Sequence, residues 1–136
     1  MTAVDTNVLV RLLTGDDVGQ AAAAKSLFAT GHIWIAKTVL LETWWVLRSY
    51  YGLDQSAIRD AFVKLLGLNN VQSEDDASVA TALQFTTQGI EFADALHLSS
   101  RPRGAAFASF DRSFVRRARR AGASNVSTFP AKGSRG

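Results

Sequence analysis

Hydrophobic residues recur along this chain at helical and at strand-like spacings. After Asn7, apolar residues three and four positions apart predict a helix that ends at Gly15. The same spacing predicts further helices at residues 21–28, 38–51, 54–66, 75–88, 92–100 and 112–121. Short apolar or alternating runs predict strands at residues 2–4, 32–36, 71–73, 105–110 and 125–129.

The alternation of predicted strands and helices indicates the fold class. Strands that are separated by helices pair in parallel, and the helices then cover both faces of the sheet. The length of 136 residues is that of one ordinary domain. We therefore predict an α/β fold, a parallel-sheet α/β/α sandwich in a single domain over residues 1–130, with a flexible basic tail at residues 131–136.

The composition excludes several kinds of site. Hydrophobic residues make up 47% of the chain and charged residues 20%, which is a globular composition. The chain has no cysteine, so disulfides and zinc thiolate sites are excluded, and His32 and His97 are too few to suggest a zinc centre. The N-terminus has no basic start or long apolar run, and the most apolar stretch, residues 38–47, contains Glu42 and is short for a membrane span. We expect a cytoplasmic protein that does not enter a membrane.

Charge is distributed unevenly along the chain. Residues 1–100 contain six Lys and Arg against eleven Asp and Glu, whereas residues 101–136 contain nine against one. Five arginines fall in or next to the predicted helix at 112–121: Arg112, Arg116, Arg117, Arg119 and Arg120. They are suited to contact a phosphate backbone, but a solvated helix face with a basic tail explains the same pattern, so charge alone leaves both interpretations open.

Four acidic residues stand at positions that predict a shared site. Asp5 and Asp111 each follow a predicted strand and precede a helix, and the carboxyl ends of parallel strands meet at one crevice. Glu42 and Asp94 interrupt apolar helices. Each single Asp has a simpler interpretation as a helix N-cap. Glu42 lies about one turn inside its helix, and we expect it to be buried beside a positive partner, because an unpaired buried carboxylate is costly.

A cluster of these carboxylates would require a cation. Neighbouring carboxylates repel one another and raise one another's pKa unless a cation lies among them. Oxygen ligands without cysteine favour a hard ion, Mg²⁺ or Mn²⁺, which polarises a phosphodiester and activates water. This chemistry predicts a divalent-metal site and leaves the substrate open.

Four sequence motifs carry a resemblance to a known family. They are Val4-Asp5-Thr6-Asn7-Val8-Leu9-Val10-Arg11, Leu41-Glu42-Thr43 with Trp44-Trp45-Val46-Leu47, Phe92-Ala93-Asp94-Ala95-Leu96-His97, and Ser109-Phe110-Asp111-Arg112-Ser113-Phe114. In this order and at this length, they resemble the PIN-domain family, and in particular VapC-type toxin ribonucleases of type II toxin–antitoxin systems. The resemblance covers the whole chain, so one PIN-like nuclease domain is expected over residues 1–130.

The resemblance implies an Mg²⁺- or Mn²⁺-dependent endoribonuclease that cleaves structured RNA. It implies Asp5 and Asp94 as the principal metal ligands, with Asp111 as a further ligand and Glu42 as a further catalytic acid that binds metal or orients water. Thr6, Asn7 and Ser109 match positions that support the site or contact the scissile phosphate, and Glu91 matches a secondary acidic position. The resemblance also implies a homodimer and a cognate antitoxin.

Several other side chains have two interpretations each. His97 follows Asp94 by three residues and is either a general acid or ligand, or a structural hydrogen-bonding residue. Arg112 and Arg116 are secondary candidates for the site. The aromatic residues of the helix at 38–51 fit a core or a partner surface, and stacking on RNA bases is the alternative.

Two rival function classes fit parts of the pattern. An Asp-based phosphotransfer protein would use Asp5 as its nucleophile, but haloacid-dehalogenase-type enzymes have a second Asp two positions later, where this chain has Asn7. The acidic pair and the later Lys of a receiver domain are not evident either. A catalytically silent nucleic-acid-binding module would need only the basic C-terminal third, and four carboxylates argue against it. Metal-dependent RNA cleavage that EDTA abolishes separates the nuclease from both rivals.

Overall fold

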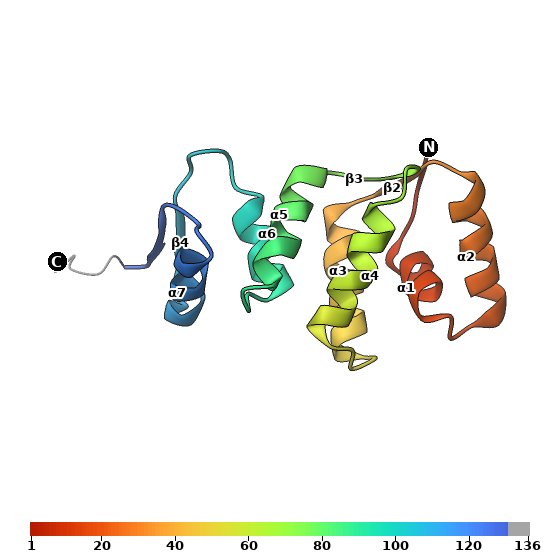
Figure 1. Cartoon of the computed structure of the whole chain (residues 1–136), viewed down its shortest axis with the longest axis horizontal. Coiled ribbons are helices and arrows are strands. Elements are labelled where there is room, and N and C mark those ends of the chain that lie inside the picture. Colours follow the sequence, from red (N-terminus) through yellow and green to blue (C-terminus); the bar gives the residue numbers. More distant parts are fainter. Residues whose placement is uncertain (131–136) are drawn as a thin grey trace. The chain divides into compact units, whose positions relative to one another are not determined.

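The structure is a computed structural model that describes residues 1–130, and these form two compact units, Met1–Val79 and the described residues from Ala80 onward. In the first unit the chain forms these elements in order: β1 (Thr2–Ala3), α1 (Thr6–Thr14), α2 (Val18–Thr30), β2 (Ile33–Ile35), α3 (Lys37–Ser49), α4 (Gln55–Leu66), β3 (Val71–Ser73) and the start of α5 (Asp76–Thr86) (Figure 1). The second unit contains the rest of α5, α6 (Phe92–Ser99), β4 (Phe107–Ser109), α7 (Arg112–Arg120) and β5 (Val126–Thr128).

The strands of the first unit form a parallel sheet in the order β1-β2-β3. Ile33 pairs with Thr2 on one side and with Val71 on the other, so β2 is the central strand. Ile33 and Ile35 are 1% and 0% exposed, because the side chains on one face of this central strand enter the core.

The core of the first unit lies between this sheet and its helices. α1 contacts both α2 and α3, and α3 contacts α4. Leu9, Leu40 and Phe62 are 0% exposed, and the Trp44 ring packs edge-on against the Phe62 ring with 5.2 Å between centroids. Such edge-to-face contacts add to the burial of the rings themselves.

The second unit has its own parallel strand pair. Phe107 of β4 pairs with Val126 of β5, and Ser109 pairs with Thr128. α7 contacts both strands and directs Phe114 onto Phe107, with 5.7 Å between ring centroids. Val115 and Ala118 of α7 are 3% exposed or less, and so is Leu98 of α6. α7 therefore has one apolar face on the strands and leaves its remaining faces to polar residues.

The predicted fold class, an α/β fold with parallel strands, is confirmed. Every predicted element is present, and β3 has the predicted bounds. Most other bounds shift by one to three residues; α2 begins at Val18 rather than at residue 21, because the Asp17 carboxylate accepts a hydrogen bond from the Gln20 N–H at 2.9 Å. The predicted tail, 131–136, lies outside the described residues, and the domain bounds stay a prediction.

None of the helices within residues 1–130 is both long and apolar enough to cross a lipid bilayer.

Candidate active site

Asp5 lies at the point where β1 passes into α1. Its backbone is extended, and its carboxylate Oδ1 accepts a hydrogen bond from the Val8 N–H at 3.1 Å, so Asp5 is the N-cap of α1. The side chain is exposed. The N-cap interpretation is therefore confirmed for Asp5. A cap of this kind uses one carboxylate oxygen and is compatible with a second role for the other.

Thr6 joins this corner of the molecule to α3. Its side chain is 9% exposed, and its hydroxyl donates a short hydrogen bond to the Glu42 carboxylate, 36 residues later in the chain. The structure thus brings Glu42 to the residue that follows Asp5. Two of the four predicted acids belong to one corner of the first unit.

The expectation that Glu42 is buried beside a positive group is wrong. Glu42 is exposed, and its hydrogen-bond partner is a neutral hydroxyl. The buried face of α3 is formed by residues three and four positions apart: Leu40, Thr43, Trp44 and Leu47. Glu42 falls off this face despite its apolar sequence neighbours, so the cost of desolvating a carboxylate does not arise.

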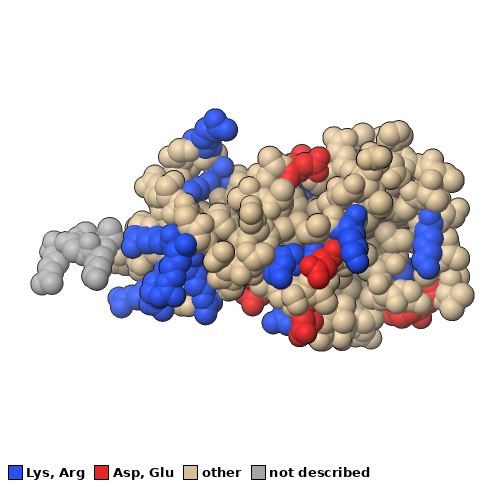
Figure 2. Space-filling model, in the orientation of Figure 1, with Lys and Arg blue, Asp and Glu red and all other residues tan. Residues whose placement is uncertain are grey.

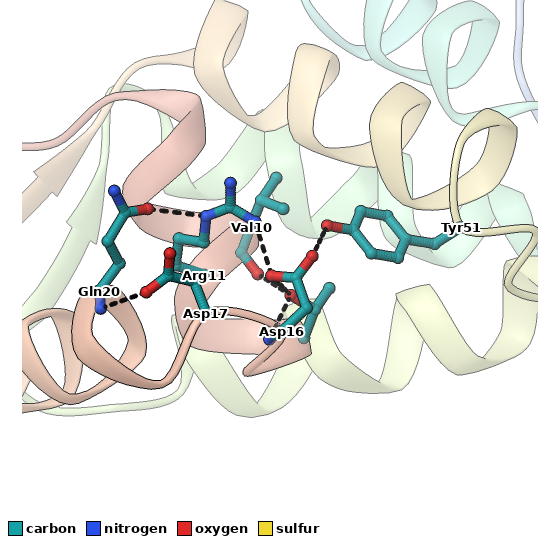
Figure 3. Close-up of polar contacts among 7 residues, drawn as sticks. Val10, Arg11, Asp16, Asp17, Gln20 and Tyr51 are labelled. Carbon is teal, nitrogen blue, oxygen red and sulfur yellow. Dashed lines mark hydrogen bonds and ion pairs between the residues drawn. The ribbon is translucent and has the colours of Figure 1, made fainter.

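A cavity of about 350 Å³ opens between α1 and α2 beside the Asp5 cap. Asp5 and Asn7 line it, and Arg11 and Gln20 belong to the same wall. The Arg11 guanidinium donates from Nε to Gln20 at 2.8 Å, which joins the two helices at this wall (Figure 3). Asn7 is thus exposed next to Asp5, at a place that a ligand can reach.

Arg11 is held by a polar network that the sequence did not predict. Its guanidinium forms an ion pair with Asp16 at 2.6 Å, and the Tyr51 hydroxyl donates to the other carboxylate oxygen of Asp16 (Figure 3). The hydrogen bonds from Tyr51 and Arg11 lower the pKa of Asp16 to about 2, and the bond from Arg11 to Asp16 raises the pKa of Arg11. The positive charge on the cavity wall is therefore fixed in place.

Asp111 and Ser109 form the corresponding corner of the second unit. Asp111 is the N-cap of α7, because its carboxylate accepts from the Phe114 N–H at 3.0 Å. The Ser109 hydroxyl oxygen accepts from the Asp111 N–H at 3.0 Å and so fixes the turn between β4 and α7. The N-cap interpretation is confirmed for Asp111 too, and Ser109 contacts the backbone of the acid that it was predicted to support.

Asp94 differs from the other two aspartates. The N-cap position of α6 is held by Glu91, whose side chain forms no capping bond, and Asp94 is the third helical residue and half-buried. The N-cap interpretation of Asp94 is therefore wrong. His97 is exposed in the last turn of the same helix, and within residues 1–130 it shares no hydrogen bond or ion pair with Asp94.

The predicted site residues offer carboxylate oxygens, which are the type of ligand that a hard divalent cation prefers. Asp5 and Glu42 belong to the first unit, and Asp94 and Asp111 to the second. Mg²⁺ is commonly bound through one or two carboxylates and keeps several waters, so carboxylate oxygens of this kind are suitable ligands. Within residues 1–130, no group of three or more His, Asp or Glu residues is arranged to hold a metal ion. The assignment of metal ligands therefore stays a prediction.

Arg112 and Arg116 lie on the exposed side of α7. With Arg119 they line a groove of about 370 Å³ against β5.

The aromatic residues of α3 and its C-terminal end have different environments. Trp44 is 4% exposed and belongs to the core, whereas Trp45 and Tyr50 are 65% and 80% exposed. The core interpretation is therefore confirmed for Trp44, and for Trp45 and Tyr50 a partner surface or stacking on RNA bases stays a prediction.

The fold and these side chains define a class of protein: an α/β protein with acidic residues at the C-terminal ends of parallel strands. The PIN domain family model matches residues 2–120, and the chain belongs to this family. PIN domains are a nuclease-type fold that binds nucleic acids and generally depends on divalent metal ions. No curated protein and no solved structure matches the chain.

Proposed function

We propose that this chain is a metal-dependent endoribonuclease of the VapC type, the toxin of a type II toxin–antitoxin pair, which acts on structured RNA in the cytoplasm. Membership of the PIN family supports nuclease chemistry. The observation that carries the proposal for this chain is the Thr6–Glu42 hydrogen bond, which brings a second acid to the Asp5 corner.

In the proposed mechanism the carboxylates of Asp5, Asp94 and Asp111 would hold Mg²⁺ or Mn²⁺. The bound ion would supply Lewis-acid stabilisation of the phosphate and a more acidic water. Glu42 would be a further ligand or would orient the attacking water, and the Thr6 hydroxyl holds the Glu42 carboxylate through its hydrogen bond. In the hydrolysis, a water oxygen would form a bond to phosphorus and lose a proton, and the bond to the departing RNA oxygen would break as that oxygen takes up a proton.

Asn7 and Ser109 have supporting roles in this proposal. Asn7 is exposed beside Asp5 on the cavity wall, where its amide is suited to contact the scissile phosphate. Ser109 holds the turn at Asp111. Glu91, at the start of α6, and His97, at its end, are secondary candidates.

Substitution of Asp5 and of Asp94 by Asn tests the catalytic assignment. Asn is as good an N-cap as Asp, so Asp5→Asn retains the helix and changes the charge. We expect Asp5→Asn and Asp94→Asn each to slow cleavage of total RNA in Mg²⁺ by about 100-fold or more, since metal stabilisation of the reacting phosphate is worth several kcal/mol. EDTA should abolish cleavage by the parent.

Asp17→Asn is the matched control, because Asp17 caps α2 with the same bond to a backbone N–H. It should leave cleavage unchanged. Folded Asp5→Asn and Asp94→Asn variants that cut as fast as the parent would contradict the assignment, and cleavage that persists in EDTA would contradict metal dependence.

The toxin role and the homodimer require separate measurements. Induction of the parent should arrest growth and produce new RNA ends, and Asp5→Asn should do neither. A cognate antitoxin, co-expressed, should restore growth. We also propose a homodimer, supported by the exposed Trp45 and Tyr50, and a monomeric mass at micromolar concentration would refute it.

A further inference from the structure

The groove between α7 and β5 is a concave surface lined by several positively charged side chains. It has a volume of about 370 Å³ and is lined by Arg112, Val115, Arg116, Arg119, Thr128 and Pro130. The three arginines follow one another at four and three positions, which places them along one side of α7. All six lining residues belong to the second unit, so this groove is complete within it.

Among the described residues, no carboxylate forms an ion pair with the arginines of the groove. Within residues 1–130, Arg112 and Arg116 form no ion pair. Arg119 donates from Nε to the Val126 carbonyl at 2.9 Å, which fixes its guanidinium beside β5 without cancelling its charge. Figure 2 shows Lys and Arg side chains gathered over α7. A ligand with several negative charges is what this surface complements.

An exposed aromatic pair lies at the ends of β4 and β5, and one of its residues is next to the groove in sequence. Phe110 is 76% exposed and Phe129 is 55% exposed, and their rings meet edge to face with 5.5 Å between centroids. The Phe129 N–H donates to the Ser109 carbonyl at 2.8 Å, which holds the ends of β4 and β5 together and keeps the rings as a pair. Phe129 lies between two lining residues of the groove, Thr128 and Pro130.

The chemistry of these two features fits a nucleotide. Guanidinium groups bind phosphate by charge and by paired hydrogen bonds, and an exposed aromatic face stacks on a base. An acidic peptide would satisfy the arginines and would leave two large apolar rings in water. A duplex would present phosphates, but its bases are already stacked on one another.

We propose that this surface, the α7–β5 groove with the Phe110–Phe129 pair, binds unpaired nucleotides of RNA, in a single strand or in the loop of a folded RNA. The phosphates lie along Arg112, Arg116 and Arg119, and one base stacks on the aromatic pair. This inference rests on the proposed function, since it names the part of the RNA substrate that the nuclease grips outside its acidic residues.

Binding of a labelled single-stranded oligouridylate of twelve nucleotides tests the inference. Fluorescence anisotropy of the chain in EDTA measures the affinity for the oligonucleotide without divalent ions, when no metal-dependent cleavage occurs. Loss of binding and loss of catalysis are therefore measured separately. Arg112→Ala with Arg116→Ala should weaken binding by about tenfold or more at 0.1 M salt. The slope of log Kd against log salt should fall in magnitude by about 1.4, because each lost phosphate contact on a single strand is worth about 0.7.

Arg103→Ala with Arg117→Ala is the matched control. It removes the same charge from exposed positions of the same unit that do not line the groove. It should change binding and salt slope by less than half as much. Equal losses of affinity in the two double variants would refute RNA binding at the groove and would indicate only a general attraction of RNA to a basic surface.

The aromatic pair is tested by Phe110→Ala against Phe110→Tyr. We expect about tenfold weaker binding for Phe110→Ala with an unchanged salt slope, and near-parent binding for Phe110→Tyr, since a tyrosine ring still stacks. The parent should also prefer the single strand to a duplex of the same length. Unchanged binding by Phe110→Ala in a folded protein, or a preference for the duplex, would overturn the assignment of unpaired nucleotides.

Discussion

At the scale of single residues, Asp16 connects the charge state of one side chain to the stability of the first unit. Its carboxylate accepts hydrogen bonds from Tyr51 and Arg11, which lower its pKa from 3.8 to about 2. A carboxylate with a lowered pKa in the folded state stabilises the fold above its unfolded pKa and loses this contribution as the pH falls through about 2. Asp16 therefore stabilises the folded protein at neutral pH.

Asp16→Asn should accordingly unfold at a lower urea concentration than the parent at pH 7. The difference should shrink as the pH falls from about 4 to about 2, where the parent's carboxylate is protonated as well. Asp75 also has a pKa of about 2, because Ser78 and then Lys37 donate hydrogen bonds to it, but it is present in both proteins and cancels in the comparison. Tyr51→Phe should reproduce part of the effect. A difference that stays constant between pH 7 and pH 2 would contradict this role of Asp16.

Two glycines of the first unit should respond to alanine in opposite directions. Gly15 ends α1 with φ at +66°, a left-handed conformation in which a side chain is strained even though open space surrounds it. Gly15→Ala should lower the free energy of unfolding by about 1 kcal/mol. Gly19 lies inside α2, where a new Cβ would meet the Asp17 carboxylate at an ordinary 3.7 Å. Gly19→Ala should be neutral or raise that free energy by about 0.5 kcal/mol. The reverse order in urea denaturation would show that the backbone at Gly15 is not left-handed.

At the scale of helices and strands, the sequence predicted the kinds of element and missed details that depend on long-range contacts. Helical spacing located α1 and α3, because burial of one helix face leaves a period that sequence displays directly. The predicted burial of Glu42 is wrong because its sequence neighbours are apolar, whereas it does not lie on the buried face of its helix. The Asp16–Tyr51 bond joins residues 35 positions apart, and no local pattern predicts such a partner. The Asp5 cap, by contrast, follows from a local rule.

The Thr6–Glu42 hydrogen bond should couple α1 to α3. A double-mutant cycle with Thr6→Val and Glu42→Ala should give a coupling free energy of about 1 kcal/mol, measured by urea denaturation, because removal of either partner breaks the same bond. Thr14→Val, at the other end of α1, provides the control cycle with Glu42→Ala and should give a coupling near zero. Equal coupling in the two cycles would mean that the bond does not join the helices.

At the scale of the whole molecule, the four predicted acids divide evenly between the two compact units, and each unit presents its pair differently. In the first unit a cap and a hydroxyl-held glutamate belong to one corner. In the second, Asp111 caps α7 and Asp94 lies within α6. Sequence order and family membership predict one shared site for the four acids. The local contacts of each acid, such as an N-cap, instead depend on hydrogen bonds within its own unit. Thermal unfolding with and without a divalent ion can separate a role of these acids in metal binding from their role in capping or stabilising a helix.

A bound divalent ion should stabilise the folded chain by mass action. At ten times its Kd, Mg²⁺ should add about 1.4 kcal/mol to the free energy of unfolding and raise the Tm by about 5 °C for a domain of this size. The comparison is made against KCl of equal ionic strength, so that screening of the many surface charges contributes equally to both samples. Asp5→Asn and Asp94→Asn should each reduce the shift, because each removes a proposed ligand. Asp17→Asn, which alters a cap outside the predicted acids, should keep it. If the parent shows no shift in Mg²⁺ or Mn²⁺, or if all variants shift equally, these carboxylates do not bind the ion, whatever the outcome for RNA binding at the α7–β5 groove.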